Sequence, residues 1–95
     1  MSSSISFKNF ILEQLRDLEN ISCKPMMGEF LFYYNGILFG GVYDDKFLIK
    51  KTNSNEKYNL SEVIPYPNAK PMYFVEDVDN ANYLEKVVKD TCKEL

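Results

Sequence analysis

Two tight turns constrain the fold of this chain more than any other feature. Asn35-Gly36 and Asp44-Asp45 separate three short apolar segments. Both residues of an Asn-Gly pair tolerate the positive φ of a type I′ turn, which joins neighbouring antiparallel strands. The sequence therefore predicts an antiparallel meander with strands over residues 29–34, 37–43 and 46–50.

Two-residue turns leave both faces of this meander apolar. They place Tyr34 opposite Ile37 and Phe32 opposite Phe39. One face then carries Phe30, Phe32, Tyr34, Ile37, Phe39 and Tyr43, and the other carries Leu31, Tyr33, Leu38, Val42, Phe47 and Ile49. Apolar side chains on both faces of a sheet need cover, and the two helices can protect only one face. We expect the other face to meet a loop, a partner protein or a second copy of the chain.

Apolar side chains at helical spacing predict a helix near each end of the chain. The first begins at a cap on Ser4 or Ser6, ends near Asn20, and carries the apolar stripe Phe7, Phe10, Ile11, Leu15 and Leu18. Asp79 is expected to cap the last helix, whose stripe is Leu84, Val87, Val88, Cys92 and Leu95.

The remaining segments complete the fold class. Residues 52–68 are polar and rich in turn residues, with a short helix expected over 55–60. Residues 72–76 are expected to form a strand at a sheet edge, because Pro71 cannot donate a ladder hydrogen bond. This order predicts one α+β domain over residues 1–95, in which an antiparallel sheet packs against N- and C-terminal helices.

Composition limits the partners of such a domain. The net charge of −3 argues against direct nucleic-acid binding, although lysines 46, 50, 51, 57 and 70 could form a local patch. No segment has the roughly 18 apolar residues that cross a membrane, and the N-terminal residues do not form a secretory signal. We therefore expect a cytoplasmic protein whose two cysteines, Cys23 and Cys92, are free thiols.

The sequence gives no positive support for catalysis, and it predicts no catalytic residue, metal site or cofactor. The chain has no histidine, which removes the commonest general base and metal ligand. Acidic residues cluster at Asp44-Asp45 and over residues 76–79. Aspartate is a preferred turn and cap residue, so structural roles explain both clusters better than a cation site does.

Two groups of residues are candidates for binding. One motif is a pair of methionines beside a glycine and an acid, and the other is a glycine pair inside a strand. Both are typical of core packing and bulges, but they also fit a methionine-lined pocket. The candidate pocket comprises Met26, Met27, Gly28, Glu29, Gly40, Gly41 and Tyr43. If the face bearing Phe32 receives the helices, the candidate interaction surface comprises Tyr33, Leu38, Val42 and Phe47.

The order of several motifs resembles the N-terminal domain family of the TfoX/Sxy competence regulators. The matching segments are Pro25–Glu29, Tyr33–Gly36, Gly40–Asp45 and Tyr66–Met72. Asn68 stands where many relatives carry glycine. The resemblance implies an α+β fold similar to the type III secretion chaperones, subunits that often pair, and a regulatory role without a known reaction. In the regulators this domain is joined to a C-terminal domain that the present sequence does not contain, so the competence role is not carried over directly.

These observations favour a small cytoplasmic regulatory domain that binds a protein partner or a second copy of itself. The alternative is a small-molecule binder or enzyme with a pocket near Met26, Met27 and Glu29. A regulator that acts on nucleic acid ranks third, because the chain is mildly acidic.

Overall fold

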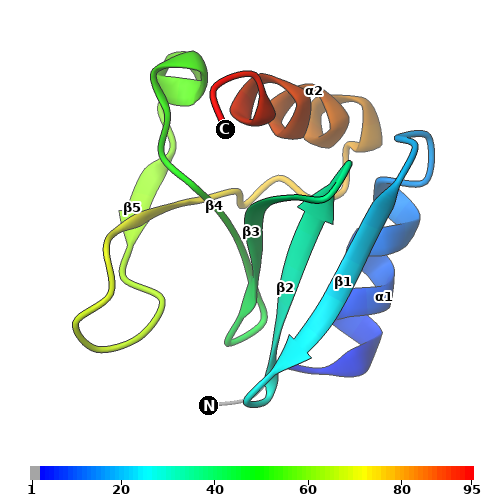
Figure 1. Cartoon of the computed structure of the whole chain (residues 1–95), viewed down its shortest axis with the longest axis vertical. Coiled ribbons are helices and arrows are strands. Elements are labelled where there is room, and N and C mark those ends of the chain that lie inside the picture. Colours follow the sequence, from blue (N-terminus) through cyan, green and yellow to red (C-terminus); the bar gives the residue numbers. More distant parts are fainter. Residues whose placement is uncertain (1–2) are drawn as a thin grey trace.

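Six strands form one antiparallel sheet in the computed structural model, which describes residues 3–95 (Figure 1). The elements are α1 (Ile5–Gln14), β1 (Ile21–Met26), β2 (Glu29–Tyr34), β3 (Ile37–Tyr43), β4 (Lys46–Ile49), the 3₁₀ helix η1 (Asn53–Tyr58), β5 (Ser61–Val63), β6 (Met72–Phe74) and α2 (Ala81–Cys92). The strands lie in the order β1-β2-β3-β4-β6-β5. Both helices contribute to a single core cluster with the sheet. The predicted α+β architecture is confirmed.

Three two-residue turns build the first four strands into consecutive hairpins. Asn35 and Gly36 have φ values of 51° and 78°, and Asp44 and Asp45 have 52° and 56°, as type I′ turns require. Met27 and Gly28, at 51° and 87°, join β1 to β2 in the same way. The sequence did not predict β1. Its Pro25 is tolerated because β1 lies at the sheet edge, where a missing N–H disrupts no internal ladder.

A β-bulge corrects the predicted register between β2 and β3. Tyr34 pairs with Ile37 as expected, but Phe32 pairs with Gly40 and not with Phe39, because the register shifts between Phe32 and Tyr33. One extra residue in a strand exchanges the faces of every residue beyond it. The predicted faces of Tyr43, Val42, Phe47 and Ile49 are therefore wrong.

The corrected register defines the core. The helix-covered face buries Phe32, Phe39, Val42, Phe47 and Ile49 completely. The rings of Phe32, Phe39 and Phe47 meet edge to face, with centroids 5.9–6.4 Å apart. The helices and the turns that follow α1 add Ile11, Leu15, Leu18, Leu84, Val87 and Val88 to this cluster. The apolar stripes thus identified the covering helices correctly. The sheet face that these helices cover differs from the predicted face at the residues beyond the bulge.

The glycine pair allows neighbouring strands to approach. A Cβ atom on Gly40 would lie 2.2 Å from the carbonyl oxygen of Leu48, and one on Gly41 would lie 2.3 Å from that of Phe30. Both contacts are far inside van der Waals distance, so any larger residue must displace backbone. The close approach involves the adjacent strands and not a helix.

Several predicted boundaries need correction. β6 lies between β4 and β5, so the predicted strand over 72–76 is not at the sheet edge. Pro71 immediately precedes β6, which is why its missing N–H does not interrupt the ladder. The cap of α2 is Asn80, whose side chain accepts from the N–H of Tyr83 at 3.1 Å, and not Asp79. The helix α1 ends at Gln14, before the predicted Asn20.

Within residues 3–95, none of the helices has the length and apolar character needed to cross a membrane.

Candidate functional site

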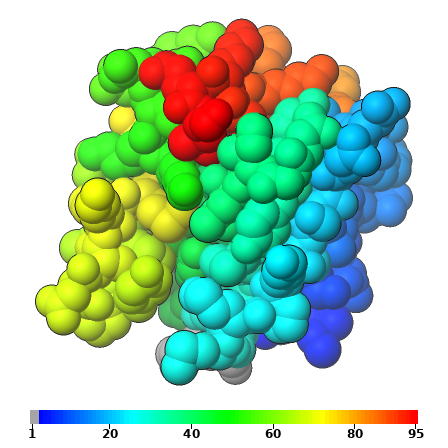
Figure 2. Space-filling view, in the orientation of Figure 1, coloured from blue at the N-terminus to red at the C-terminus, as the bar shows by residue number. Residues whose placement is uncertain are grey.

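The sheet face opposite the helices carries a groove of about 710 Å³. In Figure 2 it follows the furrow between the yellow segment near residue 70 and the teal strand β2. The lining residues are Met26, Leu31, Leu38, Gly40, Tyr43, Lys50, Lys51, Pro65, Tyr66, Ala69, Lys70, Pro71 and Met72. The volume lies within the range of roughly 300–1,000 Å³ that is usual for small-molecule sites.

Three strands supply an apolar floor for this groove. Leu31 of β2 lies between Lys24 of β1 and Gly41 of β3 in the strand register. Leu38 of β3 lies opposite Tyr33, and Met26 closes the end of β1. These side chains are only partly buried because no helix covers them. The floor is therefore an apolar sheet surface that remains open to a ligand or a partner.

The segment over residues 64–71 forms the opposite wall. The N–H of Ala69 donates to the carbonyl of Tyr66 at 3.0 Å, and Asn68 adopts a φ of 70° in this turn. Asparagine tolerates this conformation, which explains how the chain turns here without glycine. The ring of Tyr66 lies 6.4 Å from that of Tyr43, and Tyr66 remains 55% exposed. Burial raises the pKa of Tyr43, and Tyr66 and Glu29 raise it further.

Lys50, Lys51 and Lys70 line the groove. The backbone N–H of Lys50 donates to the carbonyl of Phe39 at 2.8 Å, which places Lys50 beside β3, next to Leu38. The ammonium group of Lys51 is held 3.0 Å from Glu62. No carboxylate of the described residues, 3–95, forms an ion pair with Lys50 or Lys70. Two ammonium groups among the groove residues are thus not neutralised by the chain.

The other members of the predicted lysine patch are engaged elsewhere. Lys46 lies 3.5 Å from Asp44, and Lys57 lies 3.1 Å from Asp90. Nearby carboxylates therefore offset the positive charge of three of the five lysines.

The predicted pocket residues divide between the groove and the turns beside it. Met26, Gly40 and Tyr43 line the groove. Met27 and Gly28 form the β1–β2 turn, where Met27 is 96% exposed. Gly41 packs against the backbone of Phe30.

Glu29 performs a structural task at the base of the sheet. Its carboxylate accepts from the hydroxyl of Ser3 at 2.6 Å and from the N–H of Asp44 at 3.0 Å. It therefore ties the β3–β4 turn to the segment that leads into α1.

The predicted interaction residues divide between the two sheet faces. Tyr33 and Leu38 lie on the open face, where the ammonium of Lys24 sits 5.4 Å from the ring centre of Tyr33. Val42 and Phe47 are fully buried under the helices and cannot touch a partner in this fold. The bulge between β2 and β3 is the cause, because it carries both residues to the covered face.

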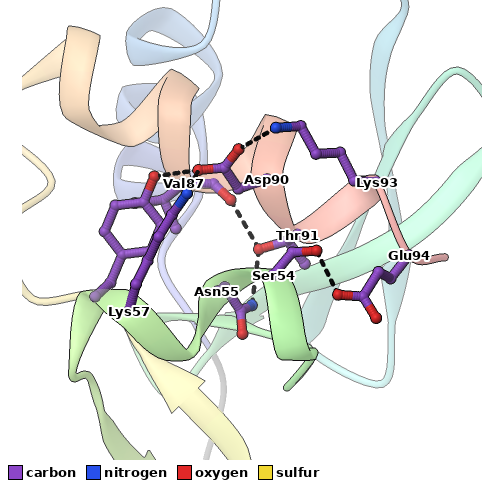
Figure 3. A network of polar contacts seen from close by, with 9 residues as sticks. Ser54, Asn55, Lys57, Val87, Asp90, Thr91, Lys93 and Glu94 are labelled. Carbon is purple, nitrogen blue, oxygen red and sulfur yellow. Dashed lines mark hydrogen bonds and ion pairs between the residues drawn. The ribbon is translucent and has the colours of Figure 1, made fainter.

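A polar network joins the end of β4 and the 3₁₀ helix η1 to α2 (Figure 3). The fully buried amide of Asn55 donates to the carbonyl of Lys50 at 2.8 Å and to the hydroxyl of Thr91 at 2.9 Å. Its oxygen accepts from the N–H of Thr52 at 3.0 Å. The exit of β4 is thereby fixed to α2.

A buried carboxylate completes this network. Asp90 accepts a hydrogen bond from the hydroxyl of Tyr58, and its oxygens lie 2.9 Å from the ammonium of Lys93 and 3.1 Å from that of Lys57. The Tyr58 hydrogen bond and the lysines hold the pKa of Asp90 well below its ordinary value. Burial and the same hydrogen bond raise the pKa of Tyr58. The network joins η1 to α2.

The remaining candidate chemistry is limited. Both cysteines are free, and burial raises the pKa of the Cys92 thiol to about 11. Between residues 3 and 95, no group of three or more Cys, Asp or Glu side chains gathers in a way that could hold a metal ion.

The pocket expected from the sequence omitted several groove residues, namely Leu31, Lys50, Lys70, Tyr66 and Met72. The alternation of β2 placed Leu31 on the same face as Tyr33, and Lys50 and Lys70 were expected only as members of a lysine patch. No local pattern places the wall segment over the sheet.

Two comparisons with known proteins find sequence similarity over most of the chain. The sequence model of a family described as the TfoX N-terminal domain matches residues 13–89, which include all six strands and the whole groove lining. A relative from Spirochaeta aurantia, described as an uncharacterized 12.7 kDa protein in the trpE 5′ region, is 26% identical over 80 residues. The similarity covers 82% of this chain and 70% of the relative.

Proposed function

Because this chain belongs to the TfoX N-terminal domain family, we propose that it is a small regulatory domain that binds another protein through the open face of its sheet. The observation that carries the proposal is the partly buried apolar surface of Leu31, Tyr33 and Leu38, which no helix covers. In this proposal the protein works in the cytoplasm. Its regulatory role is linked to competence or transcription by its membership of the family.

The first partner to test is a second copy of the chain, since the resemblance to the TfoX/Sxy N-terminal domains implies subunits that often pair. Aromatic side chains dominate the energetics of protein interfaces, and Tyr33 lies on the open face of β2 with Leu38 of β3 opposite it. Packing of two such faces would remove both side chains from water.

The test is the native mass of the reduced protein, measured by light scattering over a range of concentrations. We expect a dimer, and we expect Tyr33→Ala and Leu38→Ala each to weaken it about tenfold, which corresponds to about 1.4 kcal/mol. Ile5→Ala is the matched control, because Ile5 is exposed on α1, away from the open face. A monomer at every concentration, or equal effects of all three variants, would contradict pairing through this face.

A second candidate function is the binding of a small molecule in the groove. Met26, Gly40 and Tyr43 line a groove of suitable volume, and this specific observation favours the second candidate. A ligand that binds only the folded chain raises its midpoint of thermal unfolding, so a thermal-shift screen tests this function independently of pairing.

A further inference from the structure

The groove combines an apolar floor with an uncompensated positive charge. Met26, Leu31, Leu38 and Met72 offer apolar atoms from four different strands. Methionine side chains are flexible and polarisable, so they adapt to ligands of varied shape. An apolar body laid on this floor would displace water from partly exposed side chains, and the removal of apolar surface from water favours binding.

Lys50 and Lys70 provide the charge. Among residues 3–95 neither ammonium is paired with a carboxylate, whereas Glu62 already engages the neighbouring Lys51. An anion beside them therefore gains an attraction that no internal ion pair has to give up.

The backbone of Lys50, one of these two lysines, is held by two hydrogen bonds. The N–H of Lys50 is bound to Phe39, and its carbonyl accepts from the buried amide of Asn55. A positive site carried on a fixed strand end loses less entropy on binding than one carried on a loose loop.

The far end of the groove differs in chemistry. Tyr43 and Tyr66 close it with an aromatic pair, and Glu29 is near enough to influence Tyr43 electrostatically. Glu29 itself is engaged with the N–H of Asp44. Aromatic rings beside a carboxylate accept an apolar tail better than an anionic head, so the two ends of the groove distinguish the two ends of a ligand.

We propose that this groove binds a small amphipathic carboxylate, with its apolar body on strands β1–β3 and its carboxylate beside Lys50 and Lys70. The inference rests on the second function above, and it adds the chemical class of the ligand.

The test compares three probes of equal chain length below their micelle-forming concentrations: decanoate, 1-decanol and decyltrimethylammonium. Isothermal titration of the wild-type protein should show decanoate binding at least tenfold more tightly than decanol, and the cation binding least. Affinity for decanoate should fall as salt increases, because salt screens the lysine charges.

Matched variants separate the effect of the two groove charges from the effect of the overall net charge. The double variant K50Q/K70Q should lose at least tenfold in decanoate affinity and should bind decanol unchanged. The control K86Q/K89Q removes the same charge from two exposed lysines of α2 and should keep the decanoate affinity of the wild type. Circular dichroism verifies that every variant is folded.

A third variant tests the place of binding. Ala69→Trp adds a large ring to the groove wall, outside the helix-covered core, and should abolish binding of both decanoate and decanol.

The outcomes are distinct. Equal affinities for decanoate and decanol, or full decanoate affinity in K50Q/K70Q, would overturn the carboxylate proposal. If Ala69→Trp still blocks binding in that case, the groove remains a ligand site for another class. No binding of any probe would overturn both ideas about the groove, whereas pairing through Tyr33 is judged separately by light scattering.

Discussion

Single residues decide the geometry of this sheet. Gly36 and Gly40 illustrate two different needs for glycine. Gly36 has a φ of 78° and open space where a Cβ would lie, so only its backbone conformation requires glycine. Gly40 has no such conformation, but a Cβ there would collide with Leu48 and Ile49 backbone atoms. The turn glycine is readable from its Asn-Gly motif, whereas the strand glycine is explained only by the neighbouring strand.

This difference predicts unequal costs of substitution. Gly36→Ala should lower the free energy of unfolding by about 1–2 kcal/mol, the cost of a left-handed conformation with a Cβ. Gly40→Ala should lower it by more, because overpacking of about 1–3 kcal/mol is added to a displacement of the β3–β4 ladder. Urea denaturation measures both. A smaller loss for Gly40→Ala than for Gly36→Ala would show that the strands separate easily.

At the scale of elements, polar contacts reinforce an aromatic contact between η1 and α2, in which the rings of Tyr58 and Tyr83 meet edge to face with centroids 5.7 Å apart. Asn55 satisfies three groups from the β4–η1 segment and α2, and Asp90 gathers Tyr58, Lys57 and Lys93. The sequence predicted a short helix in this region, but nothing local indicated that Asn55 or Asp90 would be buried. Both are residue types that normally face water, and the hydrogen bonds and ion pairs with their partners offset the cost of removing them from water.

The charge of Asp90 predicts a pH dependence. Because its pKa is lower in the folded protein than in the unfolded chain, its contribution to stability is complete above the ordinary value of about 3.9 and is lost as pH falls toward the lowered pKa. Asp90→Asn should therefore reduce stability at pH 7 and flatten its decline below pH about 4. Denaturant titrations across pH test this, with Asp17→Asn at an exposed site as control. Identical pH profiles for wild type and Asp90→Asn would contradict the assigned role.

The buried amide of Asn55 predicts a link between the network and the groove. Asn55→Ala leaves the carbonyl of Lys50 without its donor, which should lower the free energy of unfolding by about 1–3 kcal/mol. The loosened β4 exit should also weaken decanoate binding. Ser54→Ala is the control, because the side chain of Ser54 hydrogen-bonds to Glu94 and takes no part in holding the carbonyl of Lys50. A stability loss without any change in decanoate affinity would separate the two roles.

For the whole molecule, the uncovered sheet face is the feature on which the proposed partner binding rests. Helices protect one face, while the other is covered only in part by residues 64–71. The family match extends over every strand of this face.

Pairing through the open face predicts a thermal midpoint that depends on protein concentration, because association stabilises the folded state by mass action. The midpoint of the wild type should rise as concentration increases, whereas that of Tyr33→Ala should rise less. Differential scanning calorimetry over a hundredfold concentration range provides the measurement. Parallel curves for the two proteins would argue against Tyr33 as an anchor.

The sequence by itself determined the hairpins around Asn35-Gly36 and Asp44-Asp45, the two helices and the α+β class, but not the hairpin that β1 forms with β2. Turns such as Asn35-Gly36 and helical stripes such as Leu84–Val88 depend on interactions within a few residues, so local chemistry is sufficient to specify them. Tertiary structure alone decided which side chains face outward. The bulge at Phe39 depends on how β3 fits between its neighbours, and it moved Val42 and Phe47 to the core. The groove needs the 64–71 segment folded over distant strands, and the free charge of Lys50 and Lys70 depends on where every carboxylate finally lies.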